Sequence, residues 1–317
     1  MFKNPLSQEN FADPFITYDK ATGYYYLIAS SQCNQITIYR SKRVGDILTK
    51  RDSKVVYECG AGGVYGPLWA PEMYKIGEKW YIYTSCREED STNLWATKRL
   101  LILQSKTEDP FDGFEFGSKP DCSIFAIDPT STIINGKQYI CYSRVNCKGT
   151  QVLDIREMSN PLTFTDNLAE IAVPSLPWEF AEGYKGDAAI NEGAFFVKKG
   201  KRLFVIYSAN GCWSDDYCLG VLEHTGGEIC RTENWIKHEK PLFMKGNGVF
   251  GVGHASFFTS SNETELWCAY HCLLRSNPTR EEMDRHTCVQ KIAFDENDYP
   301  VMGEPIGINT EINEPSN

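Results

Sequence analysis

One pattern recurs five times along the 317-residue chain and constrains its fold more than any other feature. Each copy is a turn followed by alternating aromatic and aliphatic residues. The copies are "TGYYYLIASS" (22–31), "GEKWYIYTSC" (77–86), "GKQYICYSR" (136–144), "GKRLFVIYSA" (200–209) and "NETELWCAYH" (262–271). Such alternation after a turn predicts a strand entered from a hairpin. No stretch of comparable strength has helical periodicity, so we predict an all-β chain.

A second short apolar strand precedes each copy, and each of these strands carries an unusual residue. Trp69, Asp128, Glu192 and His254 each lie eight positions before the start of their repeat, and Asp13 lies ten before Gly23. We therefore predict one structural position that recurs five times. Five sheets arranged radially form a β-propeller, whose first strands line the central axis. The expected fold is a single five-bladed β-propeller domain over residues 1–317, with these residues around one axial pocket.

Charge and hydropathy limit the partners and the location. The net charge is −10, and no run of Lys or Arg interleaves with aromatic residues, so neither nucleic acid nor a membrane is an expected partner. A neutral substrate fits better. No apolar stretch approaches the length of a membrane span, and the first residues lack the apolar core of a signal peptide. We expect a cytoplasmic protein, or a secreted one if a leader peptide has been removed.

The twelve cysteines are scattered along the apolar runs. No C-x-x-C pair faces a second such pair or a pair of histidines, so a metal site built from cysteines is not expected. We predict free thiols that act as small buried apolar side chains.

Three carboxylates and a histidine at one axis suggest glycoside hydrolysis. This chemistry needs one carboxyl group that stays protonated and one that is ionised, and a third can adjust their pKa values. Asp13, Asp128 and Glu192 supply such a set. A single Asp-Pro pair is normally a turn, so the weight of the argument rests on the shared register of the three residues.

The order of the motifs resembles glycoside hydrolase family 43, which comprises five-bladed inverting arabinofuranosidases, xylosidases and arabinanases. The motifs are "ADPF", "WAPE", "IDPT", "NEG" and "GHASFF", and the resemblance covers essentially the whole chain. Two further segments, "YSANGCW" (207–213) and "RHTCVQKIAFDENDYP" (285–300), are similar to the fourth-blade segment and the closing strand of the family's propeller.

The resemblance implies a role for each of five residues. Asp13 would be the general base, Glu192 the general acid and Asp128 the residue that modulates the acid's pKa. Arg285 would contact the sugar in the first subsite. His254 would lie at the axis, where family members hold water or Ca²⁺, and it would bind such an ion directly or through water. No cofactor is expected to be required.

A second candidate for the acid, Glu182 in "AEGYKGD", precedes Glu192 by ten residues. We prefer Glu192, because it keeps the eight-residue offset and leads straight into the apolar run "AFFV". Trp69, at a strand mouth, is expected to stack on a sugar face. Trp213, on a loop after the fourth-blade strand, either lines the leaving-group side or simply packs. Glu72 is expected to be structural or to form hydrogen bonds at the rim.

His271 and His286 carry no informative pattern.

The favoured function is the release of α-L-arabinofuranosyl units from pentose-containing oligosaccharides or polysaccharides of the arabinan or arabinoxylan type, with inversion. A β-xylosidase or endo-arabinanase on the same fold is the alternative. A retaining fructan-cleaving hydrolase would show "NDPNG" early in the chain, "RDP" in the third blade and "EC" in the fourth. Only "EC" occurs, within "YECG" (57–60), and it lies in the wrong blade. A non-catalytic sugar-binding propeller would not need three acids. The sequence leaves the oligomeric state open.

Overall fold

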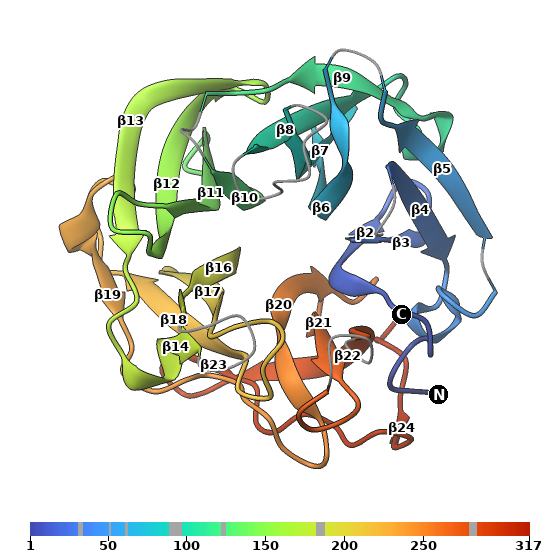
Figure 1. The fold of residues 1–317 in the computed structure, drawn as a ribbon. Coiled ribbons are helices and arrows are strands. Elements are labelled where there is room, and N and C mark those ends of the chain that lie inside the picture. Colours follow the sequence, from blue (N-terminus) through green and yellow to red (C-terminus); the bar gives the residue numbers. More distant parts are fainter. Residues whose placement is uncertain are drawn as a thin grey trace.

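The computed structural model describes residues 1–30, 34–50, 52–60, 63–88, 97–121, 125–181, 188–278 and 284–317. Five four-stranded antiparallel sheets stand around a central axis, and the first strand of each lies nearest the centre (Figure 1). The predicted five-bladed β-propeller is confirmed.

The blades follow one another along the chain. Blade 1 consists of β2 (Ala12–Asp19), β3 (Tyr24–Ser30), β4 (Gln35–Ser41) and β5 (Asp52–Glu58). Blade 2 consists of β6 (Tyr65–Ile76), β7 (Lys79–Arg87), β8 (Lys98–Ser105) and β9 (Phe114–Ser118). Blade 3 consists of β10 (Ala126–Ile134), β11 (Lys137–Val145), β12 (Gln151–Asn160) and β13 (Thr163–Ala172).

Blade 4 consists of β16 (Asn191–Lys199), β17 (Arg202–Ala209), β18 (Cys218–His224) and β19 (Trp235–Lys237). Blade 5 consists of β20 (Phe250–Thr259), β21 (Leu266–Leu273), β22 (His286–Phe294) and β23 (Pro300–Val301). Two small sheets pair β1 (Phe2–Lys3) with β24 (Glu311–Ile312) and β14 (Phe180–Ala181) with β15 (Ala188–Ala189).

The helices in the described ranges are four 3₁₀ turns, η1 (Val44–Asp46), η2 (Pro110–Asp112), η3 (Pro177–Glu179) and η4 (Thr232–Asn234). None of these helices is long enough to cross a membrane.

Both faces of the repeated strands are buried, which explains their nearly continuous apolar sequences. In β3, Tyr26 packs toward blade 2, where its ring centroid lies 5.9 Å from that of Trp80. The side chain of the preceding residue, Tyr25, points to the opposite face of the strand, and its ring centroid lies 5.9 Å from that of Phe258 in blade 5. Because successive side chains of a strand alternate between its faces, aromatic residues at consecutive positions fill two different interfaces between blades.

The ring closes between blades 1 and 5, where the two chain termini lie close together (Figure 1). Asn4 donates its side-chain amide to Val289 O and accepts the Val289 N–H, both at 2.9 Å. The backbone N–H groups of Leu6 and Phe11 donate to the carbonyls of Thr287 and Arg285. The segment before β2 is thereby fixed along the start of β22.

Each inner strand contains a β-bulge at one common place. The ladder register breaks between Ala12 and Phe15, Trp69 and Glu72, Ile127 and Thr130, Glu192 and Phe195, and Gly253 and Ser256. The first bulged residue always has a left-handed backbone, with φ of 52° at Asp13, 43° at Ala70, 55° at Asp128, 52° at Gly193 and 48° at His254. Bulges of this kind re-aim side chains at functional sites.

The bulges correct one prediction. Asp13, Asp128 and His254 are structurally equivalent, but Trp69 and Glu192 are not equivalent to them, because each lies one residue before its bulge. Ala70 and Gly193 occupy the shared position in blades 2 and 4. The eight-residue count from the turn failed here because it cannot locate the bulge.

The cysteines behave as predicted within the described ranges. Ten of them are free, and seven of these ten are buried. Cys33 and Cys122 lie outside the described residues.

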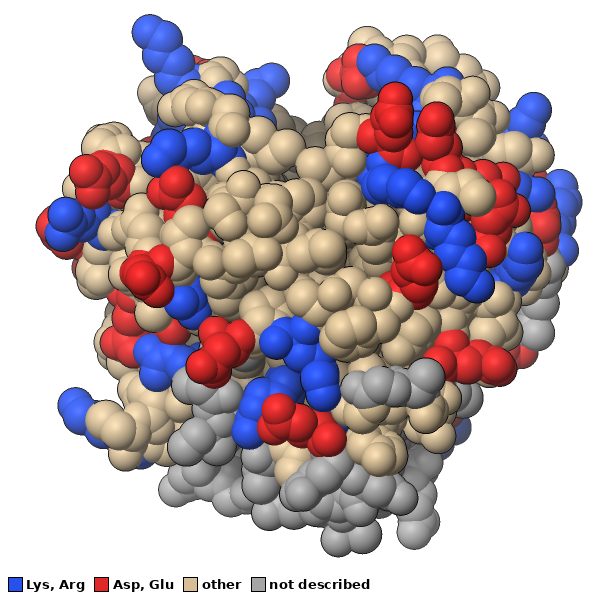
Figure 2. Space-filling model, turned by 90° about the horizontal axis from the view of Figure 1, so that it is seen from above, with Lys and Arg blue, Asp and Glu red and all other residues tan. Residues whose placement is uncertain are grey.

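On the face of the molecule shown in Figure 2, Lys and Arg side chains are intermixed with Asp and Glu side chains.

Candidate active site

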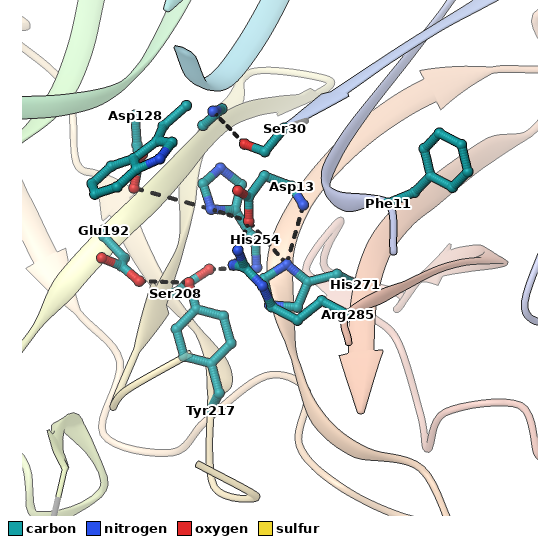
Figure 3. A network of polar contacts seen from close by, with 12 residues as sticks. Phe11, Asp13, Ser30, Asp128, Glu192, Ser208, Tyr217, His254, His271 and Arg285 are labelled. Carbon is teal, nitrogen blue, oxygen red and sulfur yellow. Dashed lines mark hydrogen bonds and ion pairs between the residues drawn. The ribbon is translucent and has the colours of Figure 1, made fainter. Parts of the chain in front are cut away.

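The structure brings Asp13, Asp128, Glu192, His254 and Arg285 together at the axis (Figure 3). Asp13 and Asp128 are each 7% exposed. His254 Nδ1 lies between them, 3.4 Å from Asp13 Oδ1 and 4.0 Å from Asp128 Oδ2. Three inner strands from different blades therefore supply the carboxylates, and a fourth supplies the imidazole.

Asp13 is held as a carboxylate. Arg285 Nη1 donates to its Oδ1 at 3.0 Å, and His271 Nδ1 lies 3.0 Å from the same oxygen. Burial alone would raise the pKa of Asp13, but Arg285, followed by His254 and His271, lowers that pKa well below its usual value. Burial lowers the pKa of Arg285, but the charge of Asp13, together with those of Cys212, Tyr217 and Glu192, more than offsets burial, so that this pKa is raised.

Glu192 is in the opposite electrostatic situation. Gln151 donates its amide to Oε2 at 2.6 Å, and the hydroxyl of Tyr217 lies 2.9 Å from Oε1. Burial nevertheless raises the pKa of Glu192, and it outweighs the favourable effects of His254, Tyr217 and Gln151 on the ionised form. The charge of Asp13 raises that pKa further.

Asp128 has a pKa well above its usual value. Burial is the largest cause, and the charges of Glu192 and Asp13 add to it, while a hydrogen bond from the Gly193 N–H opposes them. Glycine is needed at position 193, because φ is +52° and a Cβ atom would lie 3.0 Å from His254 Nδ1. The site thus holds one carboxylate that favours ionisation beside two carboxyl groups that favour a proton.

The residues at the axis do not fit a metal held by protein ligands. His254 turns Nδ1 toward the two aspartates, and its backbone N–H donates to Ser208 Oγ at 2.7 Å. In the described ranges, no three His, Cys, Asp or Glu side chains are placed to hold a metal ion. The expectation of Ca²⁺ on His254 stays a prediction without support from this geometry.

The paired carboxyl groups at the axis of a five-bladed propeller point to a glycosidase, and the comparison with known families decides which one. The sequence model of the family described as "Glycosyl hydrolases family 43" matches residues 2–300. The chain belongs to this family. It is accordingly a glycoside hydrolase that acts on O-glycosyl bonds, and the fructan-cleaving and non-catalytic alternatives are set aside.

Relatives with named activities are similar over most of the chain. An extracellular exo-α-(1→5)-L-arabinofuranosidase of Streptomyces avermitilis is 29% identical over 96% of this chain, which spans 64% of that enzyme. The enzyme of the same name from Streptomyces chartreusis is 29% identical over 85% of this chain, which spans 82% of it. The crystal structure of an α-L-arabinofuranosidase from Lactobacillus brevis has a TM-score of 0.88 at 25% identity and covers 98% of both chains. Since two of these relatives are named extracellular enzymes, the expected cytoplasmic location gains no support.

Trp69 lies in β6, just before the blade 2 bulge, and is partly exposed. The Nζ atom of Lys98 stands 3.7 Å from the centre of the Trp69 ring system and donates to Pro67 O at 2.7 Å. Lys98 is fully buried, and burial lowers its pKa to about 7. A lysine thus supports the indole that the sequence predicted to stack on sugar.

Two other candidates of this family 43 chain, Trp213 and Glu72, have their own packing and hydrogen-bond partners. Trp213 packs its ring over Gly211, where an added Cβ would lie 2.4 Å from the indole, in a turn between β17 and β18. Glu72 is buried and hydrogen-bonded by Tyr74, and burial raises its pKa to about 8. The structural interpretation of Glu72 is confirmed and the rim interpretation is wrong. Glu182 lies outside the described residues.

Sequence reasoning missed three residues that contact the predicted acid and base, namely Gln151, Tyr217 and His271. Gln151 and Tyr217 begin or precede strands of blades 3 and 4 and carry no motif. His271 did leave a signal, because it ends the fifth repeat, whereas the other four copies have serine one residue before their ends. The expectation that His271 is uninformative is wrong.

Proposed function

We propose that this protein is an inverting exo-acting α-L-arabinofuranosidase, which releases terminal α-L-arabinofuranosyl units from oligosaccharides of the arabinan or arabinoxylan type. The main observation behind the proposal is the opposed ionisation of Asp13 and Glu192 in one buried site, with the pKa of the first lowered and that of the second raised. Environments that push two carboxyl groups apart in pKa assign them to base and acid roles. The pentose is chosen from the arabinofuranosidase relatives.

In the proposed reaction, Asp13 accepts a proton from a water molecule as the water oxygen attacks the anomeric carbon. The bond from that carbon to the leaving oxygen breaks, and Glu192 donates its proton to this oxygen. The sugar leaves with inverted anomeric configuration. Arg285 contacts the sugar in the first subsite while it keeps Asp13 ionised.

Asp128 modulates the acid. It shares the buried site with Glu192, and the two negative charges disfavour one another. A proton on either group is therefore held more tightly, so Glu192 keeps its proton until the leaving oxygen needs it. Trp69 forms one wall of the sugar site.

The roles are tested by combining variants with two kinds of substrate. Glu192→Ala should lose about 10²–10⁴-fold in kcat/KM on natural arabino-oligosaccharides, because the leaving oxygen needs a proton. It should lose much less on 4-nitrophenyl arabinofuranoside, whose leaving group is stable without one. Asp13→Ala should be inactive on both substrates. ¹H NMR of the released sugar should show inversion.

Glu182→Ala is the matched control for the acid. If this variant shows the leaving-group dependence while Glu192→Ala affects both substrates equally, the acid has been misassigned. Faster turnover of 4-nitrophenyl xylopyranoside than of the arabinofuranoside would replace the proposed pentose by xylose.

A further inference from the structure

The second strands of the five blades share one register position, and four of them carry serine there. The residues that pair with the position before each bulge are Ser30, Ser85, Ser143, Ser208 and His271. Blade 5 is therefore the exception, and its histidine faces Asp13. The exception requires a chemical reason.

Three of the four serines bind the next blade, whereas Ser85 Oγ has no hydrogen-bond partner among the described residues. Ser30 Oγ accepts the N–H of Ala70 at 2.7 Å, and Ser208 Oγ accepts the N–H of His254 at 2.7 Å. In each case the donor is the first bulged residue of the following blade. A serine in blade 5 would form the same bond to the backbone of Asp13. A structural link between blades therefore does not explain why this position is a histidine.

His271 has the contact of the serines and one more. The Asp13 backbone N–H points at its Nδ1 at 3.3 Å, and the same nitrogen lies 3.0 Å from Asp13 Oδ1. One ring nitrogen cannot donate to the carboxylate and accept from the N–H at the same time. The shorter contact, to an ionised oxygen, favours a proton on Nδ1. Nε2 is buried without a partner among the described residues and then carries a bare lone pair.

The face of His271 carries a second ring. The ring of Tyr217 stacks on the imidazole with centroids 5.4 Å apart and an angle of 2° between the planes. Gly253, directly opposite His271 in the ladder, makes room, since a Cβ atom there would lie 2.3 Å from the Tyr217 ring. The hydroxyl of Tyr217 reaches Glu192 Oε1 at 2.9 Å. One stacked pair thus touches both Asp13 and Glu192 (Figure 3).

We propose that His271 and Tyr217 are positioning residues that fix the base and the acid relative to each other. The inference rests on the proposed function of Asp13 and Glu192. Within the described ranges, the nitrogens of Arg285, His271 and His254 that face the Asp13 carboxylate all approach Oδ1. This arrangement holds one rotamer and directs Oδ2 to the attacking water. The hydroxyl of Tyr217 fixes Glu192 in the same frame.

The charges around Asp13 determine what His271 contributes. Asp13 faces Arg285, His254 and His271, and also the carboxyl groups of Asp128 and Glu192. Burial lowers the pKa of His271 to about 4, so at neutral pH it supplies a hydrogen bond and no charge. Its removal deletes one bond that favours the ionised form of Asp13. The pKa of Asp13 must then rise.

The first test is the pH dependence of kcat/KM on 4-nitrophenyl arabinofuranoside. His271→Ala should lower kcat on the order of 10–100-fold with little change in KM, because a positioned base is worth about that much. The acidic limb should move upward by about one pH unit. His271→Asn puts an amide donor where Nδ1 was, and it should restore the acidic limb. His271→Gln does not put one there, and it should not.

Tyr217 and Gly253 test the pairing. Tyr217→Phe keeps the stack but removes the hydroxyl from Glu192, so only the alkaline limb should move, to higher pH. Gly253→Ala displaces the Tyr217 ring and should move both limbs. Ser30→Ala is the matched control, since it removes the equivalent bond between blades, to the Ala70 N–H, without removing a contact to either carboxyl group. It should lower the melting temperature and leave both limbs in place.

The inference is overturned if His271→Ala and Gly253→Ala lower the melting temperature as Ser30→Ala does while both limbs stay in place. A second readout is independent of turnover. The Asp13 carboxyl carbon can be titrated by ¹³C NMR, with its resonance assigned by its loss in Asp13→Asn. Its midpoint should rise in His271→Ala. If the wild-type protein cleaves no pentoside, the proposed function fails, and this titration alone decides the positioning role.

Discussion

Replacing Glu179 by glutamine should strongly destabilise the protein, because this fully buried carboxylate accepts five hydrogen bonds. Its Oε2 accepts the N–H groups of Ser175 and Leu176 at 2.6 and 2.8 Å. Its Oε1 accepts from Asn191 Nδ2, Tyr207 OH and Lys237 Nζ at 2.9, 2.9 and 2.6 Å. The network fixes η3 against blade 4, next to the strand that carries Glu192.

Glutamine has one oxygen where glutamate has two. Whichever way the amide is turned, its NH₂ group faces two or three donors and leaves them unpaired. Each unpaired buried donor costs about 1–3 kcal/mol, and breaking a buried ion pair costs about 3–5 kcal/mol in total. Since these costs overlap, we expect Glu179→Gln to lower the free energy of unfolding by about 3–5 kcal/mol. This loss corresponds to a fall in melting temperature of roughly 5–8 °C for a chain of this size.

The assay is urea denaturation at pH 7 and at low pH. Burial raises the pKa of Glu179, but Lys237 and the two backbone N–H groups more than offset this effect, so the pKa of the folded state is lowered. The stabilisation is therefore present above the unfolded pKa and is lost as the pH falls through the folded value. The difference between wild type and variant should shrink at pH 3.

Glu157→Gln is the matched control. Glu157 also accepts hydrogen bonds from a lysine and an asparagine, Lys137 and Asn167, both at 2.9 Å. The Lys137–Glu157 ion pair, however, lies at the surface. Exposed pairs contribute about 0–1 kcal/mol, so this variant should be nearly as stable as the wild type. Equal losses in the two variants, or a loss in Glu179→Gln that does not depend on pH, would contradict the reasoning.

Three further predictions concern the site. Gln151→Ala removes a donor from Glu192 Oε2, which raises the pKa of the acid, so the alkaline limb of kcat/KM should move to higher pH; an unchanged limb would contradict this. Gly193→Ala should lower kcat at least tenfold, because the new Cβ would lie 3.0 Å from His254 Nδ1. It should also lower the free energy of unfolding, measured by urea denaturation, by about 1–2 kcal/mol, because φ at this position is +52°. Incubation with a chelator should leave activity unchanged, whereas a loss that zinc reverses in the folded protein would refute it.

The sequence carried enough information to predict the blades. Strands such as "YYYLIAS" alternate large apolar side chains toward two neighbouring sheets, and that pattern repeats at a nearly constant spacing. The repeat pattern could not locate the bulge, since a bulge changes the ladder register without changing the residue count from the turn. The equivalence assigned to Trp69 and Glu192 was wrong by one residue for this reason.

The contacts of the site were harder to predict than its carboxylates. Tyr217 reaches Glu192 from a turn, and its position depends on the absent side chain at Gly253. Such a dependence between a turn of blade 4 and a strand of blade 5 leaves no periodic trace. His271 could have been found by comparing the ends of the five repeats, since the other four have serine one residue before the end, and the strand ladders place those serines at the position of His271.

The closure of the ring between blades 1 and 5 has a consequence for the order of folding. Asp13 belongs to the first blade, but its partners His271 and Arg285 are 258 and 272 residues away in the sequence. Contacts between distant segments close the largest loops and form slowly, whereas each blade is built from neighbouring hairpins. A refolding chain should therefore regain its strands before its proposed base has a guanidinium beside it. Catalytic competence would then be the last property to appear, and its recovery would report that the two ends of the chain have met.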